Sequence, residues 1–246
     1  MLKKFVKTTV AALGVTLLLS SCGGGSLPNY DYEIDMKPYK NAITVSGKSY
    51  LTLVNKQNPC GEEYTPDALS AIPSELTLYG KAVQMEASAA LAAEALVREL
   101  HARGYEHIVV TSGYRDYAYQ QILFNTYLGN EQTKHPDWTL EQCRAEVLTY
   151  SALPGESEHQ TGLCMDLIST NNPVLDATFA DDPAYAWLVD NAHNFGFILR
   201  YPEGAEDITG YSYESWHFRY VGRYHAERIT ALGITLEEYL EDYYAK

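Results

Sequence analysis

The chain reads Ser157-Glu158-His159-Gln160-Thr161-Gly162-Leu163-Cys164-Met165-Asp166 across its most informative stretch. Thr161-Gly162 is expected to turn the chain, so that His159 and Asp166 can converge on one metal ion. Leu163 to Ile168 is typical of a strand, along which Cys164, Asp166 and Ile168 share one face. This stretch therefore predicts a turn followed by a strand that presents metal ligands.

The run Glu214-Ser215-Trp216-His217 offers the remaining groups of a hydrolytic metal site. A catalytic zinc takes three protein ligands and keeps a fourth position for water, and His159, Asp166 and His217 would supply those ligands. If the chain bends before a strand at 216–221, the Glu214 carboxylate faces that water without binding the metal. A carboxylate in that position can act as a general base.

These residues resemble the VanY-like D-alanyl-D-alanine carboxypeptidases. Residues 157–166 are similar to the family's Ser-x-His-x-x-Gly-x-Ala-x-Asp signature, Glu214 to His217 to its Glu-x-x-His, and Ser112-Gly113-Tyr114-Arg115 to its Ser-Gly-Tyr-Arg element. The resemblance covers about residues 50–244. It implies an α+β fold, with a small antiparallel sheet flanked by helices, like that of the hedgehog-like D,D-peptidases. It also implies Zn²⁺ on His159, Asp166 and His217, with Glu214 handling protons.

The resemblance further implies that the substrate is a peptidoglycan stem peptide. Arg115 is expected to hold its terminal carboxylate or to polarise its carbonyl, which suits a planar guanidinium. A structural salt bridge is the other interpretation of Arg115. Gln120 and Ser157 are candidate substrate contacts, and each is also explicable as a local hydrogen-bonding group.

The resulting prediction is a zinc carboxypeptidase that removes the terminal D-alanine from stem peptides during cell-wall remodelling. An L,D-carboxypeptidase or a D-Ala-D-Ala dipeptidase acting on the same material would use the same motifs. A catalytically silent lipoprotein that binds muropeptides is an alternative of a different class. The enzyme is favoured because Glu214 and all three predicted ligands are present.

The amino terminus is typical of an exported protein. Three lysines precede an apolar run, Val10 to Leu19, and a small-residue pair then leads to Cys22, an arrangement that resembles a bacterial lipobox. We expect a lipoprotein signal peptide at 1–22, a flexible tether and stalk at 23–49, and the catalytic domain at 50–246. An ordinary signal peptide followed by a chance cysteine is the alternative. The protein is expected to be a monomer outside the cytoplasm, anchored to the membrane through lipid on Cys22.

Composition narrows the possible partners. The formal net charge of −14 repels phosphate backbones, so we expect no nucleic-acid partner. Cys60 and Cys143 form a disulfide or remain free. Cys164 is either a buried thiol behind the metal or a fourth ligand that would close the site.

Periodicity and capping residues predict the other elements. Helices are expected at 84–103, 116–128, 139–150 and 182–193, with a short one after Thr235, and strands at 50–55, 107–111, 197–200 and 216–221. The segment 128–151 is expected to form a flap at the rim of the cleft.

Overall fold

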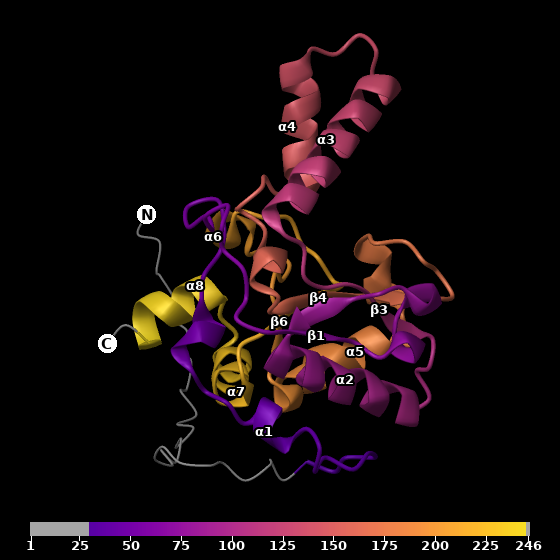
Figure 1. Cartoon of the computed structure of the whole chain (residues 1–246), viewed down its shortest axis with the longest axis vertical. Coiled ribbons are helices and arrows are strands. Elements are labelled where there is room, and N and C mark those ends of the chain that lie inside the picture. The colour runs from indigo at the N-terminus through magenta and orange to yellow at the C-terminus, as the bar shows by residue number, and fades with distance from the viewer. Residues whose placement is uncertain (1–29, 245–246) are drawn as a thin grey trace, which may run out of the picture.

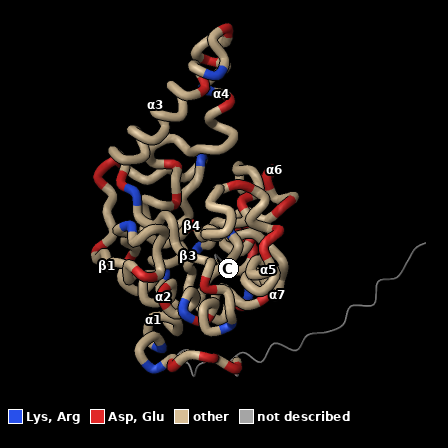
Figure 2. The backbone as a smooth tube through the Cα atoms, turned by 90° about the vertical axis from the view of Figure 1, so that its right-hand side faces the viewer, with Lys and Arg blue, Asp and Glu red and all other residues tan. Residues whose placement is uncertain are grey.

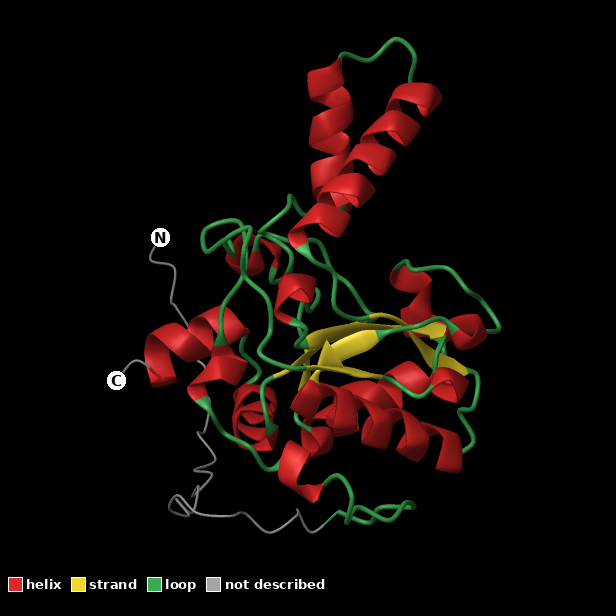
Figure 3. Cartoon of the chain, in the orientation of Figure 1, coloured by secondary structure: helices red, strands yellow, loops and turns green. Residues whose placement is uncertain are grey.

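A four-stranded antiparallel sheet lies at the centre of the computed structural model, which describes residues 30–244 (Figure 3). Residues 1–29 and 245–246, and with them the predicted signal peptide and Cys22, lie outside the described residues. The strand order is β3-β4-β6-β5, and a separate pair is formed by β1 and β2. The bounds are β1 (Leu69–Ala71), β2 (Gln84–Glu86), β3 (Ile108–Ser112), β4 (Cys164–Ser169), β5 (Phe197–Leu199) and β6 (His217–Tyr220).

Helices flank the sheet and extend from it (Figure 1). They are α1 (Lys40–Ile43), α2 (Ala87–Ala102), α3 (Tyr117–Lys134), α4 (Leu140–Tyr150), α5 (Pro183–Asn191), α6 (Glu206–Thr209), α7 (Arg223–Leu232) and α8 (Leu236–Glu238). The predicted α+β class is therefore confirmed, and the strands predicted at 107–111, 163–168, 197–200 and 216–221 form the central sheet. Among the described residues, no helix has the length and apolar character needed to span a membrane.

The alanine-rich helix α2 packs along the central sheet and contributes a large part of the core. Its small side chains bring the helix close to β3, and Leu96 and Leu100 are fully buried. The predicted helix began at Gln84, but the structure starts it at Ala87, because the Glu86 carboxylate caps the backbone N–H groups of Ser88 and Ala89. The three residues before Ala87 form β2 instead.

The domain begins earlier than residue 50. The predicted stalk at 23–49 is wrong for its described part, since Met36, Tyr39 and Ile43 are buried in the same core as α2. The Tyr220 hydroxyl also donates a hydrogen bond to the backbone carbonyl of Ala42. The only α-helix in this described segment is the four-residue α1, which is too short to give a hydrophobic period, so patterning alone did not reveal that the segment packs in the core.

The strand predicted at 50–55 is also absent. A 3₁₀ helix, Lys48–Leu51, occupies its start, and the Asn55 side chain then closes a turn by accepting the backbone N–H of Asn58 at 2.9 Å. The carbonyl groups of Tyr50 and Thr52 accept hydrogen bonds from the buried Arg219 guanidinium, at 3.1 and 2.8 Å. The Arg219 side chain of β6 thus occupies backbone acceptors that a neighbouring strand would otherwise use.

Helices α3 and α4 form a hairpin that projects from the body of the protein (Figure 1). The predicted end of α3 at 128 is too early, because the helix continues to Lys134 with Glu131 buried and hydrogen-bonded to Lys134 and Tyr150. The capping box of Thr139 and Gln142 starts α4 as predicted. Most of α3 carries no charged residue (Figure 2).

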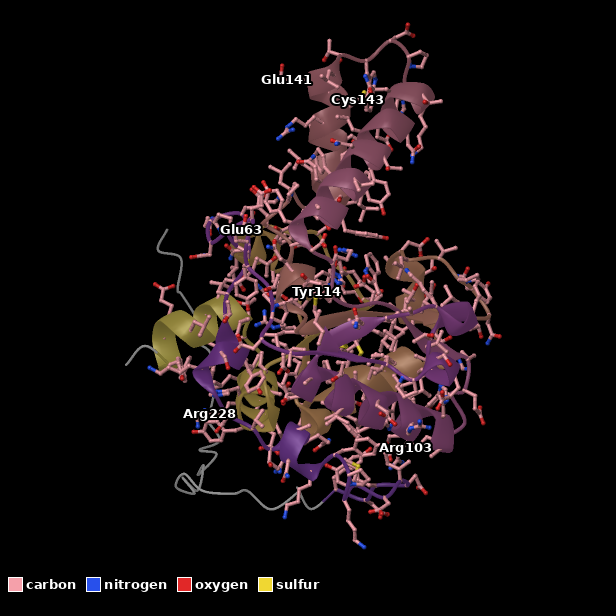
Figure 4. All side chains as sticks on the ribbon, in the orientation of Figure 1. Glu63, Arg103, Tyr114, Glu141, Cys143 and Arg228 are labelled. Atoms are coloured by element: carbon pink, nitrogen blue, oxygen red, sulfur yellow. The ribbon has the colours of Figure 1, made fainter. Side chains whose placement is uncertain are left out.

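All three cysteines in the described part of the chain are free, so the Cys60–Cys143 disulfide does not form. Cys143 lies buried inside the projecting hairpin, whereas Glu63, three residues from Cys60, lies on the body (Figure 4). The two thiols therefore belong to separate parts of the fold.

Candidate active site

A tight turn brings His159 next to the strand that carries Asp166. His159 lies in a 3₁₀ helix, Glu158–Thr161, and Gly162 ends it with a φ of +68°. A left-handed residue is needed here, and an added Cβ would lie 2.8 Å from the backbone nitrogen of Glu86, so glycine fits both demands. The His159 Nε2 consequently lies 3.2 Å from an oxygen of Asp166.

Strand pairing supplies the third predicted ligand. Asp166 on β4 is directly opposite His217 on β6 in the antiparallel register, and His217 Nδ1 lies 3.1 Å from Asp166 Oδ1. The two imidazole rings meet edge to face, with centroids 5.1 Å apart. The structure thus brings the three predicted ligands together, and all three are buried.

The group fits a zinc ion. His159 Nδ1 contacts the Gly113 carbonyl at 2.5 Å, which keeps a proton on Nδ1 and leaves Nε2 free to bind a metal. Two imidazole nitrogens and a carboxylate are one of the donor sets that catalytic zinc sites use. Burial opposes charge on Asp166, yet the two imidazoles hold the pKa of its carboxyl well below the ordinary value, so it is ready to ligate.

Cys164 lies fully buried beside these ligands. Its Sγ and nitrogens of His159 and His217 lie within 4.8 Å of one another. Burial alone would raise the pKa of this thiol, but the two imidazoles lower it to about 7. Cys164 is fully buried and does not line the cleft, but its Sγ is close enough to both imidazoles to be a fourth ligand, so both interpretations of this thiol remain open.

Glu214 lies just before β6, where the chain bends as predicted. The backbone N–H of His217 donates to the Glu214 carbonyl at 3.3 Å, and a Glu214 carboxylate oxygen lies 3.5 Å from His217 Nδ1. Burial raises the pKa of this carboxyl to about 7, against the opposing effect of His217. A carboxyl that titrates near neutrality beside a metal site can accept and return a proton.

Arg115 points into the same cleft and lacks a close anionic partner. Its Nη1 forms a long ion pair with Asp166, whose carboxylate oxygen lies 3.8 Å away. Its hydrogen-bond acceptors are neutral side chains: Ser112 Oγ at 3.0 Å, Gln120 Oε1 at 3.2 Å and Ser157 Oγ at 3.5 Å. This geometry favours a carboxylate-binding role over a purely structural salt bridge, because the guanidinium is held by neutral groups and its ion pair with Asp166 is long.

Gln120 and Ser157 line the cleft, but both are turned toward Arg115. Gln120 also donates to the Ala152 carbonyl at 2.9 Å, which fixes the orientation of its amide. Gln120 and Ser157 therefore contact Arg115 and hold its guanidinium in place. Tyr114, which precedes Arg115, lies between the sheet and the base of the hairpin (Figure 4).

The cleft has a volume of about 450 Å³ and is walled by elements distant in sequence. Tyr127 and Tyr150, at the base of the hairpin, line one side, and Tyr211 and Tyr213 also line it. The predicted flap at 128–151 thus reaches the cleft only through the end of α4, while the rest projects away (Figure 1).

Sequence reasoning missed several residues of the site. Tyr201 packs against His217 with ring centroids 4.9 Å apart, and nothing in the spacing of this tyrosine singles it out among 21. Glu158 was visible inside the quoted stretch, but its partners, Arg200 and Arg219, are 42 and 61 positions away. Only the folded chain shows that they meet.

Comparison with known proteins agrees with this geometry. The family model described as VanY, D-alanyl-D-alanine carboxypeptidase, matches residues 82–223. The putative carboxypeptidase YodJ of Bacillus subtilis (strain 168) is 34% identical over 250 residues, covering 97% of this chain and 87% of YodJ.

Two solved structures are also similar. The LdcB LD-carboxypeptidase superposes with a TM-score of 0.68 at 37% identity, over 80% of this chain and 89% of LdcB. A VanY D,D-pentapeptidase from a VanB-type resistance cassette, in complex with Zn(II), gives 0.65 at 34% identity, over 78% of this chain and 99% of that one.

Proposed function

The chain belongs to the VanY D-alanyl-D-alanine carboxypeptidase family, and from that premise we propose that it is a zinc-dependent enzyme that removes the terminal D-alanine from peptidoglycan stem peptides. The observation that carries this proposal is the position of Arg115, which neutral side chains hold in the cleft with its Nη1 at 3.8 Å from the Asp166 carboxylate. One residue of a peptide spans about 3.3–3.6 Å. A terminal carboxylate held by Arg115 therefore places the last peptide bond beside the metal ligands.

Each residue of the site has a separate role in the proposed reaction. His159, Asp166 and His217 would hold zinc, which supplies a Lewis acid for the scissile carbonyl and lowers the pKa of a water molecule. Arg115 orients the free carboxylate through two parallel N–H donors. Glu214 takes a proton from the attacking water as the new C–O bond forms, and returns it to the nitrogen as the C–N bond breaks.

The shape of the cleft favours a carboxypeptidase over a dipeptidase. Beside the predicted ligands, the cleft of about 450 Å³ is also lined by Tyr127, Tyr150 and Tyr213. That space suits stem residues upstream of the scissile bond, which a free dipeptide does not have. Cleavage of a tetrapeptide stem by L,D-carboxypeptidase activity would use the same groups.

Defined muropeptides test the proposal. The zinc-loaded protein is incubated with pentapeptide and tetrapeptide stems and with D-Ala-D-Ala, and the products are weighed by mass spectrometry. We expect the pentapeptide to lose one alanine. Conversion of the tetrapeptide alone would assign L,D-specificity. Cleavage of D-Ala-D-Ala alone would show a dipeptidase, and binding of the stems without turnover would show a catalytically silent binder.

We also propose that the protein acts as a monomer outside the cytoplasm, held at the membrane by lipid on Cys22. The lysines, apolar run and small residues that precede Cys22 support this placement. Peptidoglycan lies in the same compartment, so the anchor would keep the enzyme near its substrate.

A further inference from the structure

Two buried polar atoms face each other beside the predicted metal ligands without hydrogen-bond partners. They are Glu158 Oε2 and His217 Nε2, which lack a partner among the described residues and are separated by 3.7 Å. Both side chains are almost fully buried, at 0% and 5% exposure. A buried polar group without a partner is costly, so a pair of such atoms at this distance calls for an explanation.

The other oxygen of Glu158 is fully engaged. Arg200 Nε and Arg219 Nη1 both donate to Glu158 Oε1, each at 2.7 Å, and both arginine side chains are completely buried. Arg200 is fixed in turn by Glu237, through two contacts of 2.8 and 2.6 Å. The carboxylate is therefore clamped on one oxygen, which leaves Oε2 directed at His217.

The opposite nitrogen of the same imidazole faces the metal site. His217 Nδ1 lies 3.1 Å from Asp166 Oδ1 and 3.5 Å from Glu214 Oε2, so Nδ1 is the nitrogen available to a cation. When Nδ1 binds a metal, the imidazole proton must reside on Nε2, where it meets Glu158. Metal-binding histidines generally donate their second N–H to an outer acceptor, which fixes the ring and strengthens the ligand.

We propose that Glu158 is a positioning residue, which accepts the Nε2 proton of His217 and so orients that ligand toward zinc. The 3.7 Å separation exceeds a hydrogen bond, so the contact shortens when the metal fixes the ring. Arg200 and Arg219 provide the charge that allows a carboxylate to remain at this depth. The inference rests on the zinc assignment of the proposed function and adds to it the group that supports His217.

The variant Glu158→Gln is the direct test. The glutamine amide has one carbonyl oxygen, which must accept the hydrogen bonds of both arginines. The amide NH₂ group then faces the Nε2 proton of His217, so that two donors oppose each other. We expect the zinc dissociation constant, measured by competition with a chromogenic chelator, to rise by about 10- to 100-fold. The matched control is Glu237→Gln, which disturbs the same Arg200 but forms no hydrogen bond or ion pair with His217 among the described residues. An equal loss of zinc affinity in both variants would overturn the proposal.

The wild-type protein gives a second test that does not depend on whether a variant folds. Long-range ¹H–¹⁵N spectra of histidine distinguish the two tautomers of an imidazole. With zinc bound, we expect His159 as the Nδ1–H tautomer, on the Gly113 carbonyl, and His217 as the Nε2–H tautomer with slow solvent exchange. A His217 Nε2–H that exchanges freely, or an Nδ1–H tautomer, would refute the role of Glu158 while leaving zinc binding intact. Failure to bind zinc at all would instead reject the metal assignment.

Discussion

Replacing Glu214 with glutamine tests the proton-transfer step directly. Glutamine preserves the shape of the side chain, and the bend before β6 depends on the backbone of residue 214, whose carbonyl accepts the His217 N–H. The three predicted ligands are untouched, so zinc content should remain near that of the wild type. What is lost is a carboxylate that can take a proton and give it back.

The expected effect is a fall in kcat of about 10²- to 10⁴-fold, the usual contribution of a positioned acid–base group. This corresponds to about 2.7–5.4 kcal/mol in the activation barrier, at 1.36 kcal/mol per tenfold. Released D-alanine, quantified with a D-amino acid oxidase, gives the rate, and elemental analysis gives the zinc content. The matched control is Glu206→Gln, at an exposed site on α6, which should leave kcat unchanged.

The pH dependence of the wild type has a defined sign. Glu214 must be ionised to accept a proton, and burial raises the pKa of its carboxyl from 4.5 to about 7. A bound cation lowers this value again, so the rate should fall as the pH drops through a point between these limits. Near-normal turnover of zinc-loaded Glu214→Gln, with the acid limb still in place, would refute the role given to Glu214.

Three further changes test separate parts of the structure. Arg115→Lys keeps the charge but loses the paired N–H donors. Because a hydrogen bond to a charged group contributes about 1.5–3 kcal/mol, kcat/KM should fall by about 10- to 100-fold. An unchanged kcat/KM would exclude the carboxylate contact. Gly162→Ala should lower Tm more than Gly204→Ala. Both glycines have a positive φ, but of the two only an added Cβ at position 162 would lie close to a backbone atom. Equal losses of Tm would contradict this close approach. Cys22→Ala should release the protein from the membrane fraction or block its processing, and equal retention would count against lipidation.

The pair His159 and Asp166 was predictable because these two residues are close in sequence. His159 and Asp166 lie seven positions apart, and a turn followed by a strand is enough to bring them together. His217 was a candidate ligand from its Glu-x-x-His motif, but its position opposite Asp166 depends on the antiparallel pairing of β4 with β6, which the sequence did not predict. Arg115 was predictable as a cation at a strand end, but its freedom from close anionic partners was not.

The parts that escaped prediction depend on long-range contacts. The run at 50–55 has the composition of a strand, yet Arg219 takes the carbonyl groups that a neighbouring strand would need. The segment around Met36 and Ile43 enters the core without a helical or strand period. Likewise nothing in the linear sequence distinguishes Glu158 from other acidic residues. Its buried ion pairs with Arg200 and Arg219 appear only in the folded chain.

The pairing of Asp166 with His217 also bears on how the folded chain resists heat. These residues are 51 positions apart, and one ion held by both would close that loop as a non-covalent cross-link. The described part of the chain contains no disulfide to do so. Ligands that bind only the native state raise stability in proportion to the logarithm of their concentration over Kd. Zinc supply would therefore set the melting temperature of this protein as well as its catalytic rate, and chelation would loosen the central sheet at its two middle strands.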